Sequence, residues 1–266
     1  MKIKPEDIEF VDKAKSFTSR VGTDAVLLLV GSRAAGFDDS WSDLDMWVVG
    51  DKAQLTSDEL GQYERGKALF VDRGDYEAHW TFFDKDDLLS ILRDYPDEKM
   101  WIVLTSKVLF GNQDTASALQ HECRHYPRTI VEQKLKWHFG RYWSSLGPLN
   151  AGARGRPETG FLIVGMVMEH LCKLCCLAEG KPFPYAKWLV TVAHDTTLGR
   201  RVHPFMSRAI FGIDEFLHPP QGKHYKELVP LKELRDTKGV VLATLKELGW
   251  SCSWLVNTDE AVAETM

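Results

Sequence analysis

The stretch that decides the fold is residues 27–49, which read LLLVGSRAAGFDDSWSDLDMWVV. The apolar run at 25–30 is typical of a central β-strand, and a turn of small residues follows it. Residues 43–49 alternate polar and apolar side chains at their start and are expected to form the neighbouring strand. Because residues two apart on a strand point the same way, Asp43 and Asp45 are expected to face one spot together.

The chemistry of this spot follows from its charges. Two carboxylates held close together repel each other unless a cation lies between them. Mg²⁺ is the usual cation for oxygen ligands beside phosphates. A turn of small residues that leads into a helix offers backbone N–H groups to phosphate oxygens. Gly31 and Ser32 together with Asp43 and Asp45 therefore predict a site for a Mg²⁺-bound nucleoside triphosphate.

This pattern resembles the signature of the nucleotidyltransferase superfamily, which includes DNA polymerase beta and the antibiotic nucleotidyltransferases. That signature is a hydrophobic strand, Gly-Ser, a spacer and Asp-x-Asp on the next strand. The matching residues are Gly31-Ser32 and Asp43-x-Asp45, with Ser42 before the first acid. The resemblance implies a metal-dependent transferase that uses ATP or another nucleoside triphosphate. It implies that Asp43 and Asp45 are catalytic metal ligands and that Gly31, Ser32 and Arg33 bind the nucleotide.

A third carboxylate normally completes such a site, and the superfamily places it on an adjacent strand. The corresponding strand here is expected at residues 75–83. Alternation puts Glu77 on a polar face with His79 and Thr81. Glu77 is our choice for the third catalytic and metal-binding acid, Asp75 is the second choice, and an exposed strand edge without function remains the alternative. His79 is interpreted as a polar neighbour rather than a ligand.

Composition limits the class of protein. The chain has 266 residues, 44% of them hydrophobic, and nine Trp, which suffices for a sizeable core. The net charge of −5 argues against a non-specific grip on nucleic acid. Five Cys without a regular framework indicate reduced thiols. With no apolar signal segment and no long uninterrupted apolar stretch, we expect a soluble, cytoplasmic protein with no membrane partner.

The order of patterns predicts an α+β fold with two domains. In the first, residues 1–112, strands alternate with helices at 5–20, 56–67 and 84–92, as a nucleotidyltransferase-type mixed sheet with flanking helices requires. Thr56 with Glu59 predicts a capping box, and Asp84 predicts a helix N-cap. The second domain, residues 113–266, is expected to be an all-helical, substrate-binding bundle, with helical periodicity at 129–143, 159–178, 185–196, 198–211 and 225–248.

The helical half adds one more resemblance. Residues 181–189, KPFPYAKWL, resemble a segment of a group of bacterial nucleotidyltransferase-like proteins that carry a helical domain. Lys187 at the start of its helix is predicted to reach the triphosphate as a point charge. Antibiotic-modifying members use a Glu of the helical domain as a general base, which makes Glu169 a second candidate for the general base. An ion pair of Glu169 with Lys173 on the helix surface is the favoured interpretation.

The leading hypothesis is an enzyme that moves a nucleoside monophosphate from Mg-NTP to a hydroxyl of a small-molecule acceptor. A mildly acidic protein suits an aminoglycoside-like polycation, and the acceptor is expected between the two halves. One alternative is nucleotidylation (AMPylation) of a protein partner, since the Gly-Ser-Arg-Ala-x-Gly opening is similar to that of minimal nucleotidyltransferases. Another is a nucleotide-binding module without turnover. Nucleic acid is not expected as a partner, and a homo-oligomer is compatible with the sequence.

Overall fold

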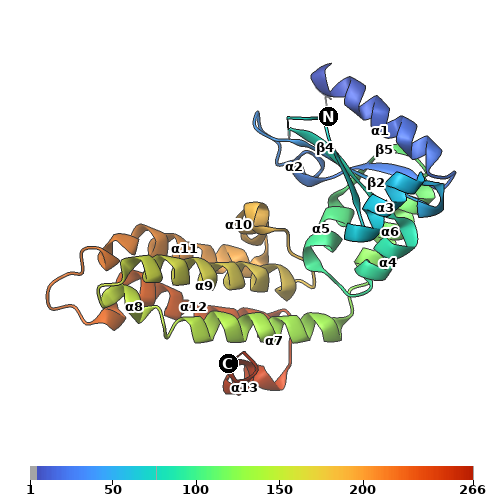
Figure 1. Cartoon of the computed structure of the whole chain (residues 1–266). Helices are drawn as coiled ribbons and strands as arrows, with labels where there is room; N and C mark the ends of the chain where they lie inside the picture. The colour runs from blue at the N-terminus through green and yellow to red at the C-terminus, as the bar shows by residue number, and fades with distance from the viewer. Residues whose placement is uncertain (1–4, 76, 266) are drawn as a thin grey trace. The chain divides into compact units, whose positions relative to one another are not determined.

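The computed structural model describes residues 5–75 and 77–265. The chain divides into two compact units, residues 1–125 and residues 126–266, and each is described here by itself. In Figure 1 the first unit is drawn in blue to green and the second in green to red. The first unit contains the sheet and the second is helical, so the expected α+β class is confirmed.

A five-stranded mixed sheet forms the centre of the first unit, in the order β3-β4-β2-β1-β5. The central strand β2 pairs in parallel with β4 and antiparallel with β1. Strand β3 pairs antiparallel with β4, and β5 pairs antiparallel with β1. The strands are β1 (Val26–Leu29), β2 (Leu44–Gly50), β3 (Leu69–Asp72), β4 (Ala78–Asp84) and β5 (Lys107–Gly111).

The helices of this unit begin largely where the sequence expects them. The capping box of Thr56 and Glu59 at α3 is confirmed, and the Asp84 side chain caps α4 by accepting from two backbone N–H groups. The helical segments are η1 (Pro5–Asp7), α1 (Ile8–Arg20), α2 (Gly31–Ala35), η2 (Lys52–Gln54), α3 (Ser57–Gly66), α4 (Lys85–Leu92), α5 (Asp97–Thr105) and α6 (Gln113–Arg124).

The two faces of the sheet carry different residues. Leu44, Met46 and Val48 of β2 are buried in one core with side chains from α1. On the same face Trp80 of β4 lies against Phe17 of α1, with ring centroids 4.4 Å apart. The opposite face is only partly buried where β2 and β4 begin. The start of these two strands therefore presents polar side chains on the face that does not meet α1.

The first unit extends further than the sequence indicates. We expected a boundary after residue 112, whereas the division falls between His125 and Tyr126. The reason is α6, which packs against α4, α5 and β1 and so belongs to the sheet unit. Its apolar residues Ala116, Leu119 and Cys123 are buried there.

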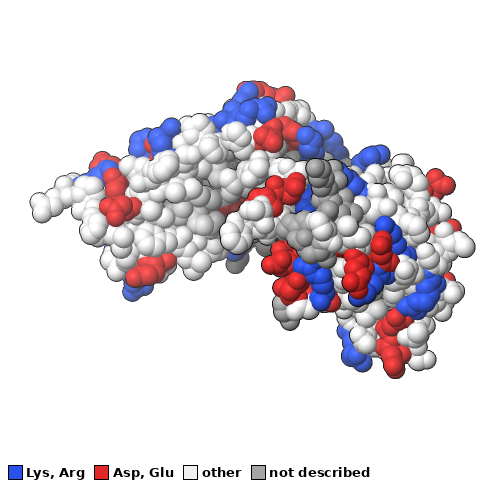
Figure 2. All heavy atoms as spheres, turned by 90° about the horizontal axis from the view of Figure 1, so that it is seen from above, with Lys and Arg blue, Asp and Glu red and all other residues white. Residues whose placement is uncertain are grey.

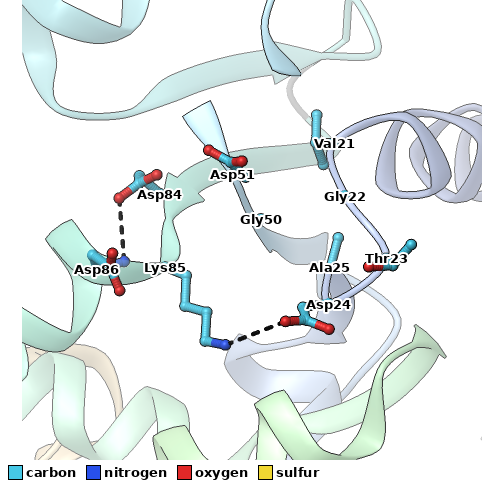
Figure 3. Close-up of a pocket in the computed structure, with 10 residues that line it drawn as sticks. All are labelled: Val21, Gly22, Thr23, Asp24, Ala25, Gly50, Asp51, Asp84, Lys85 and Asp86. Atoms are coloured by element: carbon cyan, nitrogen blue, oxygen red, sulfur yellow. Dashed lines mark hydrogen bonds and ion pairs between the residues drawn. The ribbon is translucent and has the colours of Figure 1, made fainter. Parts of the chain in front are cut away.

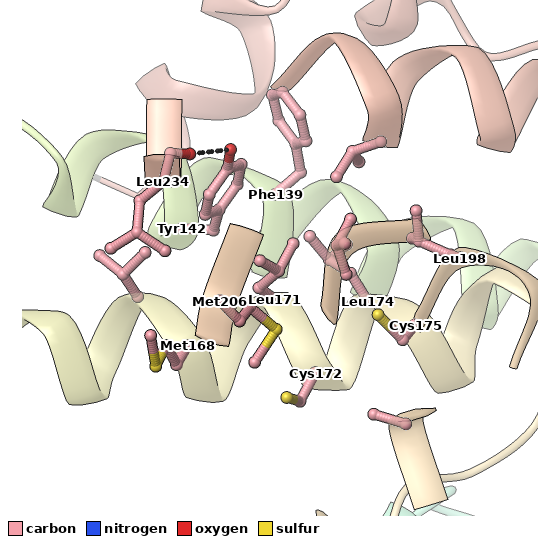
Figure 4. Close-up of a cluster of buried hydrophobic side chains, with 14 of the residues drawn as sticks. Phe139, Tyr142, Met168, Leu171, Cys172, Leu174, Cys175, Leu198, Met206 and Leu234 are labelled. Atoms are coloured by element: carbon pink, nitrogen blue, oxygen red, sulfur yellow. Dashed lines mark hydrogen bonds between the residues drawn. The ribbon is translucent and has the colours of Figure 1, made fainter. Parts of the chain in front are cut away.

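The second unit is a helical bundle, as expected, and its centre is the long helix α9. Helices α7, α10 and α11 all contact α9, and α11 packs along α12. Figure 4 shows the shared core, in which the Tyr142 hydroxyl donates to the Leu234 carbonyl at 3.1 Å. The helices are α7 (Arg128–Ser145), α8 (Asn150–Ala153), α9 (Pro157–Ala178), α10 (Ala186–His194), α11 (Thr197–Phe211), α12 (Val229–Glu247) and α13 (Asp259–Ala263), joined by the short turns η3 (Ile213–Phe216), η4 (Tyr225–Glu227) and η5 (Ser253–Leu255).

Helix α9 is the one helix, among those the structure describes, that is long and apolar enough to cross a membrane by length and composition. More than half of its apolar window, 56%, is buried inside the protein. Its residues Leu171, Leu174 and Cys175 belong to the core of the bundle. This is the pattern of a core helix in a soluble protein, and the cytoplasmic location stays a prediction.

Charge is spread rather than collected. On the face seen in Figure 2, acidic and basic side chains are interspersed. Binding to long nucleic acid depends on Lys and Arg gathered on one face. The expectation that nucleic acid is not a partner stays a prediction.

Candidate active site

Asp43 and Asp45 lie at the beginning of β2. Leu44 and Met46 are fully buried on the α1 side, whereas Asp45 keeps 24% of its side chain exposed on the other side. Asp43 directly precedes the strand and is also partly exposed. Asp45 therefore points away from the α1 side, and the expectation that Asp43 shares its face stays a prediction.

Gly31 places the bend after β1 directly against Asp45. Its φ is +68°, a left-handed conformation that favours glycine, and an added Cβ would overlap the Asp45 carboxylate oxygen Oδ2. The backbone N–H of Val30 also donates to the Asp45 carbonyl at 2.9 Å. The bend and the acid are thus held in contact from both the backbone and the side-chain side. The Ser32 side chain beside them is buried, and its phosphate role stays a prediction.

His79 is the side chain that lies opposite Asp45. The parallel register of β2 and β4 aligns these two residues, and His79 Nε2 lies 2.9 Å from Asp45 Oδ1. The hydrogen bond to Asp45 raises the pKa of His79, burial opposes the shift, and the charges of Asp45, Asp43 and Asp72 add to it. His79 is therefore the polar neighbour of the acidic pair, and its contact with Asp45 appears only once the register of two parallel strands is known.

The two candidates for the third acid lie differently from the expectation. Glu77 precedes β4 and has 72% of its side chain exposed, with Oε2 3.7 Å from Arg73 Nη2. Asp75 binds the same guanidinium more closely, at 2.6 Å. Within the described ranges 5–75 and 77–265, no group of three or more His, Cys, Asp or Glu side chains is placed to hold a metal ion. Glu77 lines the same cavity as Asp43, and its role as a catalytic and metal-binding acid stays a prediction.

Arg33 forms contacts inside the first unit. Its guanidinium is 9% exposed and pairs with Asp7 at 2.9 Å. Its Nε and Nη2 atoms donate to the Ser42 carbonyl at 3.2 and 2.8 Å. All three nitrogens thus have partners inside the protein, and Arg33 holds the loop before Asp43. Its contact with the nucleotide stays a prediction.

Asp7 is the residue of this region that sequence reasoning missed. It is 2% exposed and accepts from both Arg33 and Arg73, at 2.9 and 2.6 Å. A buried carboxylate needs such partners to offset its loss of water. Arg33 and Arg73 lie 26 and 66 residues from Asp7 in the chain, so the sequence carries no local signal for these contacts.

A cavity of about 180 Å³ adjoins Asp43. It is lined by Asp7, Arg33, Ser40, Trp41, Ser42, Asp43, Arg73 and Glu77. Three carboxylates outnumber two guanidinium groups in this lining. The lining of the cavity therefore has no excess of positive charge that would attract an anion.

A second acidic pocket lies at the other end of β2 and β4, where the strands finish (Figure 3). Its carboxylates serve the backbone. Asp84 Oδ1 accepts from the N–H groups of Asp86 and Asp87, both at 3.1 Å, and Asp51 Oδ1 accepts from Ala53 N–H at 2.8 Å. Lys85 in addition approaches Asp24 at 3.9 Å. These acids cap helical turns and are accounted for by the fold.

Two further predicted residues belong to the helical unit. Lys187 is exposed in the first turn of α10, with its ammonium 5.2 Å from the Trp188 ring, and its contact with phosphate stays a prediction. Glu169 and Lys173 form the expected ion pair on α9 at 2.6 Å. The hydrogen bond from Lys173 lowers the pKa of Glu169. The pairing interpretation of Glu169 is thus confirmed.

The acidic pair fits one divalent cation that is shared with a nucleotide. Mg²⁺ keeps several waters and binds through one or two protein carboxylates plus substrate phosphates, rather than inside a cage of protein ligands. Asp43 and Asp45 at the start of β2 are partly exposed carboxylates of this kind, and the Gly31 bend touches Asp45. The absence of a three-ligand group among the described residues is compatible with this arrangement.

Comparison with known proteins finds matches among solved structures. No family model matches the sequence, and no curated protein matches it. Eleven chains of solved structures match. One is the crystal structure at 1.90 Å of a nucleotidyltransferase-like protein from Exiguobacterium sibiricum 255-15, which is 10% identical at a TM-score of 0.48 over 97% of this chain and 89% of that chain. At this identity the likeness concerns the fold and assigns no residue a role.

Proposed function

We propose that the first unit binds Mg-NTP on the face that carries Asp43 and Asp45 and transfers the nucleoside monophosphate to a hydroxyl of a small-molecule acceptor. One observation carries the proposal: the Gly31 bend is packed against Asp45, which follows Asp43 by two residues. A phosphate-binding bend and a metal-binding acid pair are useful together only when they are adjacent. The resemblance of the Gly31-Ser32 and Asp43-x-Asp45 pattern supplies the reaction type.

The chain's own residues divide the work. Backbone N–H groups after Gly31 hold phosphate oxygens, and Asp43 and Asp45 hold the cation. When bound, Mg²⁺ neutralises phosphate charge and orients the polyphosphate. In the transfer, the acceptor oxygen forms a bond to the α-phosphorus. The bond between the α-phosphorus and the oxygen that bridges it to the β-phosphate breaks, and pyrophosphate leaves. Glu77, whose carboxylate is largely in solvent, takes the proton of the acceptor hydroxyl.

The chemistry of the acceptor is proposed from charge. The chain carries a net charge of −5, which favours a neutral or cationic acceptor over an anionic one. An aminoglycoside-like polyol with several amines meets this condition. ATP is the first donor to test, since the contacts proposed so far involve phosphates and do not select a base.

A second candidate function is nucleotide binding without turnover. The specific observation in its favour is that His79, and not a third carboxylate, faces Asp45. The two nearest alternatives, Asp75 and Glu77, lie beside Arg73. A site with two acids can hold a nucleotide and its cation, while proton removal from an acceptor needs a further base.

The experiment combines binding and turnover. The melting temperature is measured with and without Mg-ATP, and pyrophosphate release is measured across aminoglycosides and other polyols. We expect Mg-ATP to stabilise the parent protein and Asp43→Asn to abolish that shift. Asp24→Asn is the matched control, because Asp24 is an exposed acid in the other pocket of the same unit. Equal shifts in parent and Asp43→Asn would contradict both functions, and a shift without pyrophosphate release would favour the binding module.

A further inference from the structure

Trp41 is a large aromatic side chain left almost entirely in solvent. Its exposed fraction is 87%, the highest among the large apolar side chains that the structure describes. Exposing an indole ring forgoes the free energy of burying it, about 25 cal/mol for each Å² of apolar surface. Single exposed apolar residues are ordinary on protein surfaces. The position of Trp41 therefore needs support from its surroundings before it indicates function.

The turn that carries Trp41 is held firmly on both sides. The Trp41 backbone N–H donates to Asp39 Oδ1 at 2.9 Å, and the Ser42 hydroxyl donates to the same oxygen at 2.9 Å. Ser42 Oγ accepts from the Asp39 N–H at 3.0 Å. The buried Arg33 then binds the Ser42 carbonyl at 2.8 Å. The backbone of Trp41 is thus fixed in place while its ring projects outward.

The ring borders the proposed active site. Trp41 lines the cavity of about 180 Å³ that also contains Asp43, two residues away along the chain. Pockets that enclose a whole ligand measure roughly 300–1,000 Å³, so this cavity accommodates one part of a ligand. The cavity has three carboxylates and two guanidinium groups, and both guanidinium groups pair with Asp7. This lining disfavours a phosphate and favours an uncharged polar group.

We propose that Trp41 is the stacking platform for the nucleobase of the bound nucleoside triphosphate. This inference rests on the proposed function, because it assumes that the polyphosphate lies at Gly31 and Asp45. A base is planar, uncharged and rich in hydrogen-bonding edges, which matches an exposed indole beside a small polar cavity. Stacking on a rigidly held aromatic ring costs little conformational entropy and tolerates every base, since each has a π-face.

The test compares Trp41→Ala and Trp41→Phe with the parent for binding of ATP and of inorganic tripolyphosphate, each with Mg²⁺, by calorimetry. We expect Trp41→Ala to weaken ATP binding by roughly 5- to 150-fold, the range of one base–aromatic stack. Trp41→Phe should retain most of the affinity. Tripolyphosphate should bind all three proteins equally, because it has no base. Trp137→Ala is the control, since Trp137 is a partly exposed Trp of the helical unit.

The outcomes separate this inference from the function beneath it. If the parent binds neither ATP nor tripolyphosphate, the proposed function fails. If the parent binds ATP and Trp41→Ala binds it equally well, the function stands and the stacking role is overturned. Equal losses for ATP and tripolyphosphate would also overturn it, because Trp41 would then be shaping the phosphate site. Because Trp41 is exposed, we expect Trp41→Ala to melt at the same temperature as the parent when no ligand is present. If the melting temperature does change, the comparison of ATP with tripolyphosphate still isolates the contribution of the base.

Discussion

The two ends of strands β2 and β4 carry similar numbers of acids and put them to different uses. Where the strands finish, the carboxylates of Asp51 and Asp84 accept hydrogen bonds from backbone N–H groups of the helical turns that follow. Where the strands begin, Asp45 faces a histidine side chain and touches a glycine bend. The comparison teaches that hydrogen-bond partners, and not the density of carboxylates, show which acids hold the fold together.

The strongest way to disturb the beginning of the strands is Gly31→Ala. The new Cβ would have to overlap the Asp45 carboxylate, and the residue would remain at positive φ. We expect the free energy of unfolding to fall by about 2–4 kcal/mol, from backbone strain and overpacking together. Urea denaturation measures the loss.

The control for this change is Gly36→Ala. Gly36 has a φ of +82°, and an added Cβ would meet nothing within 4 Å. It should cost only the strain of a left-handed alanine, about 1–2 kcal/mol. If Gly31→Ala proved no worse than Gly36→Ala, the close approach of the bend to Asp45 would be refuted.

The other end of the strands is tested by Asp84→Ala. Asp84 caps α4 and also accepts from the Lys52 N–H at 3.0 Å. Removing the cap should lower the free energy of unfolding by about 1–2 kcal/mol. Affinity for Mg-ATP, measured in the folded protein, should stay unchanged. Loss of nucleotide affinity without loss of stability would reverse the roles assigned to the two pockets.

The smallest expected effect is the opposite response of the two ends to pH. The hydrogen bond to Asp45 raises the pKa of His79 above its ordinary 6.5, so this contact stabilises the fold fully below pH 6.5. The stabilisation is lost as pH rises through the higher folded-state value. At the other end, hydrogen bonds from Lys52 and then Tyr63 lower the pKa of Asp87 below 3.8, so its contribution is present above that pH and is lost as pH falls through the folded-state value.

The measurement is the free energy of unfolding from pH 3 to 9 for the parent, His79→Gln and Asp87→Asn. His79→Gln should flatten the decline on the alkaline side, and Asp87→Asn should flatten the decline on the acid side. Each pair is partly exposed, and pairs of this kind contribute up to about 1 kcal/mol. A His79→Gln curve that parallels the parent above pH 6.5 would show that the His79–Asp45 contact carries no charge in solution.

Much of the sheet could be predicted from the sequence because its signals are local. Alternation predicted that Asp45 points away from the buried Leu44 and Met46, and the capping residues Thr56 and Asp84 marked the starts of α3 and α4. Strand β3 was missed because only four residues form it and two of them, Val71 and Asp72, are half-buried. Helix α5 was missed as well, since its apolar residues lie on more than one side.

The contacts that shape the candidate site could not be predicted, because they join distant parts of the chain. Asp7 meets Arg33 and Arg73 only after α1 has packed on the sheet. His79 meets Asp45 only through the parallel register of two strands that are separated by α3 and β3 in sequence. For the same reason the sequence pattern alone could not show that Arg33 binds the Ser42 carbonyl or that Glu77 lies beside Arg73.

The central claim is that the acid pair at the start of β2 and the adjoining bend bind Mg-NTP. The most direct measurement is isothermal titration of the parent and of Asp45→Asn with a non-hydrolysable ATP analogue and Mg²⁺. The account predicts saturable 1:1 binding to the parent that depends on Mg²⁺ and is abolished in Asp45→Asn, with Asp24→Asn binding as the parent does. Binding of equal strength in Asp45→Asn, or no binding to the folded parent at all, would contradict it.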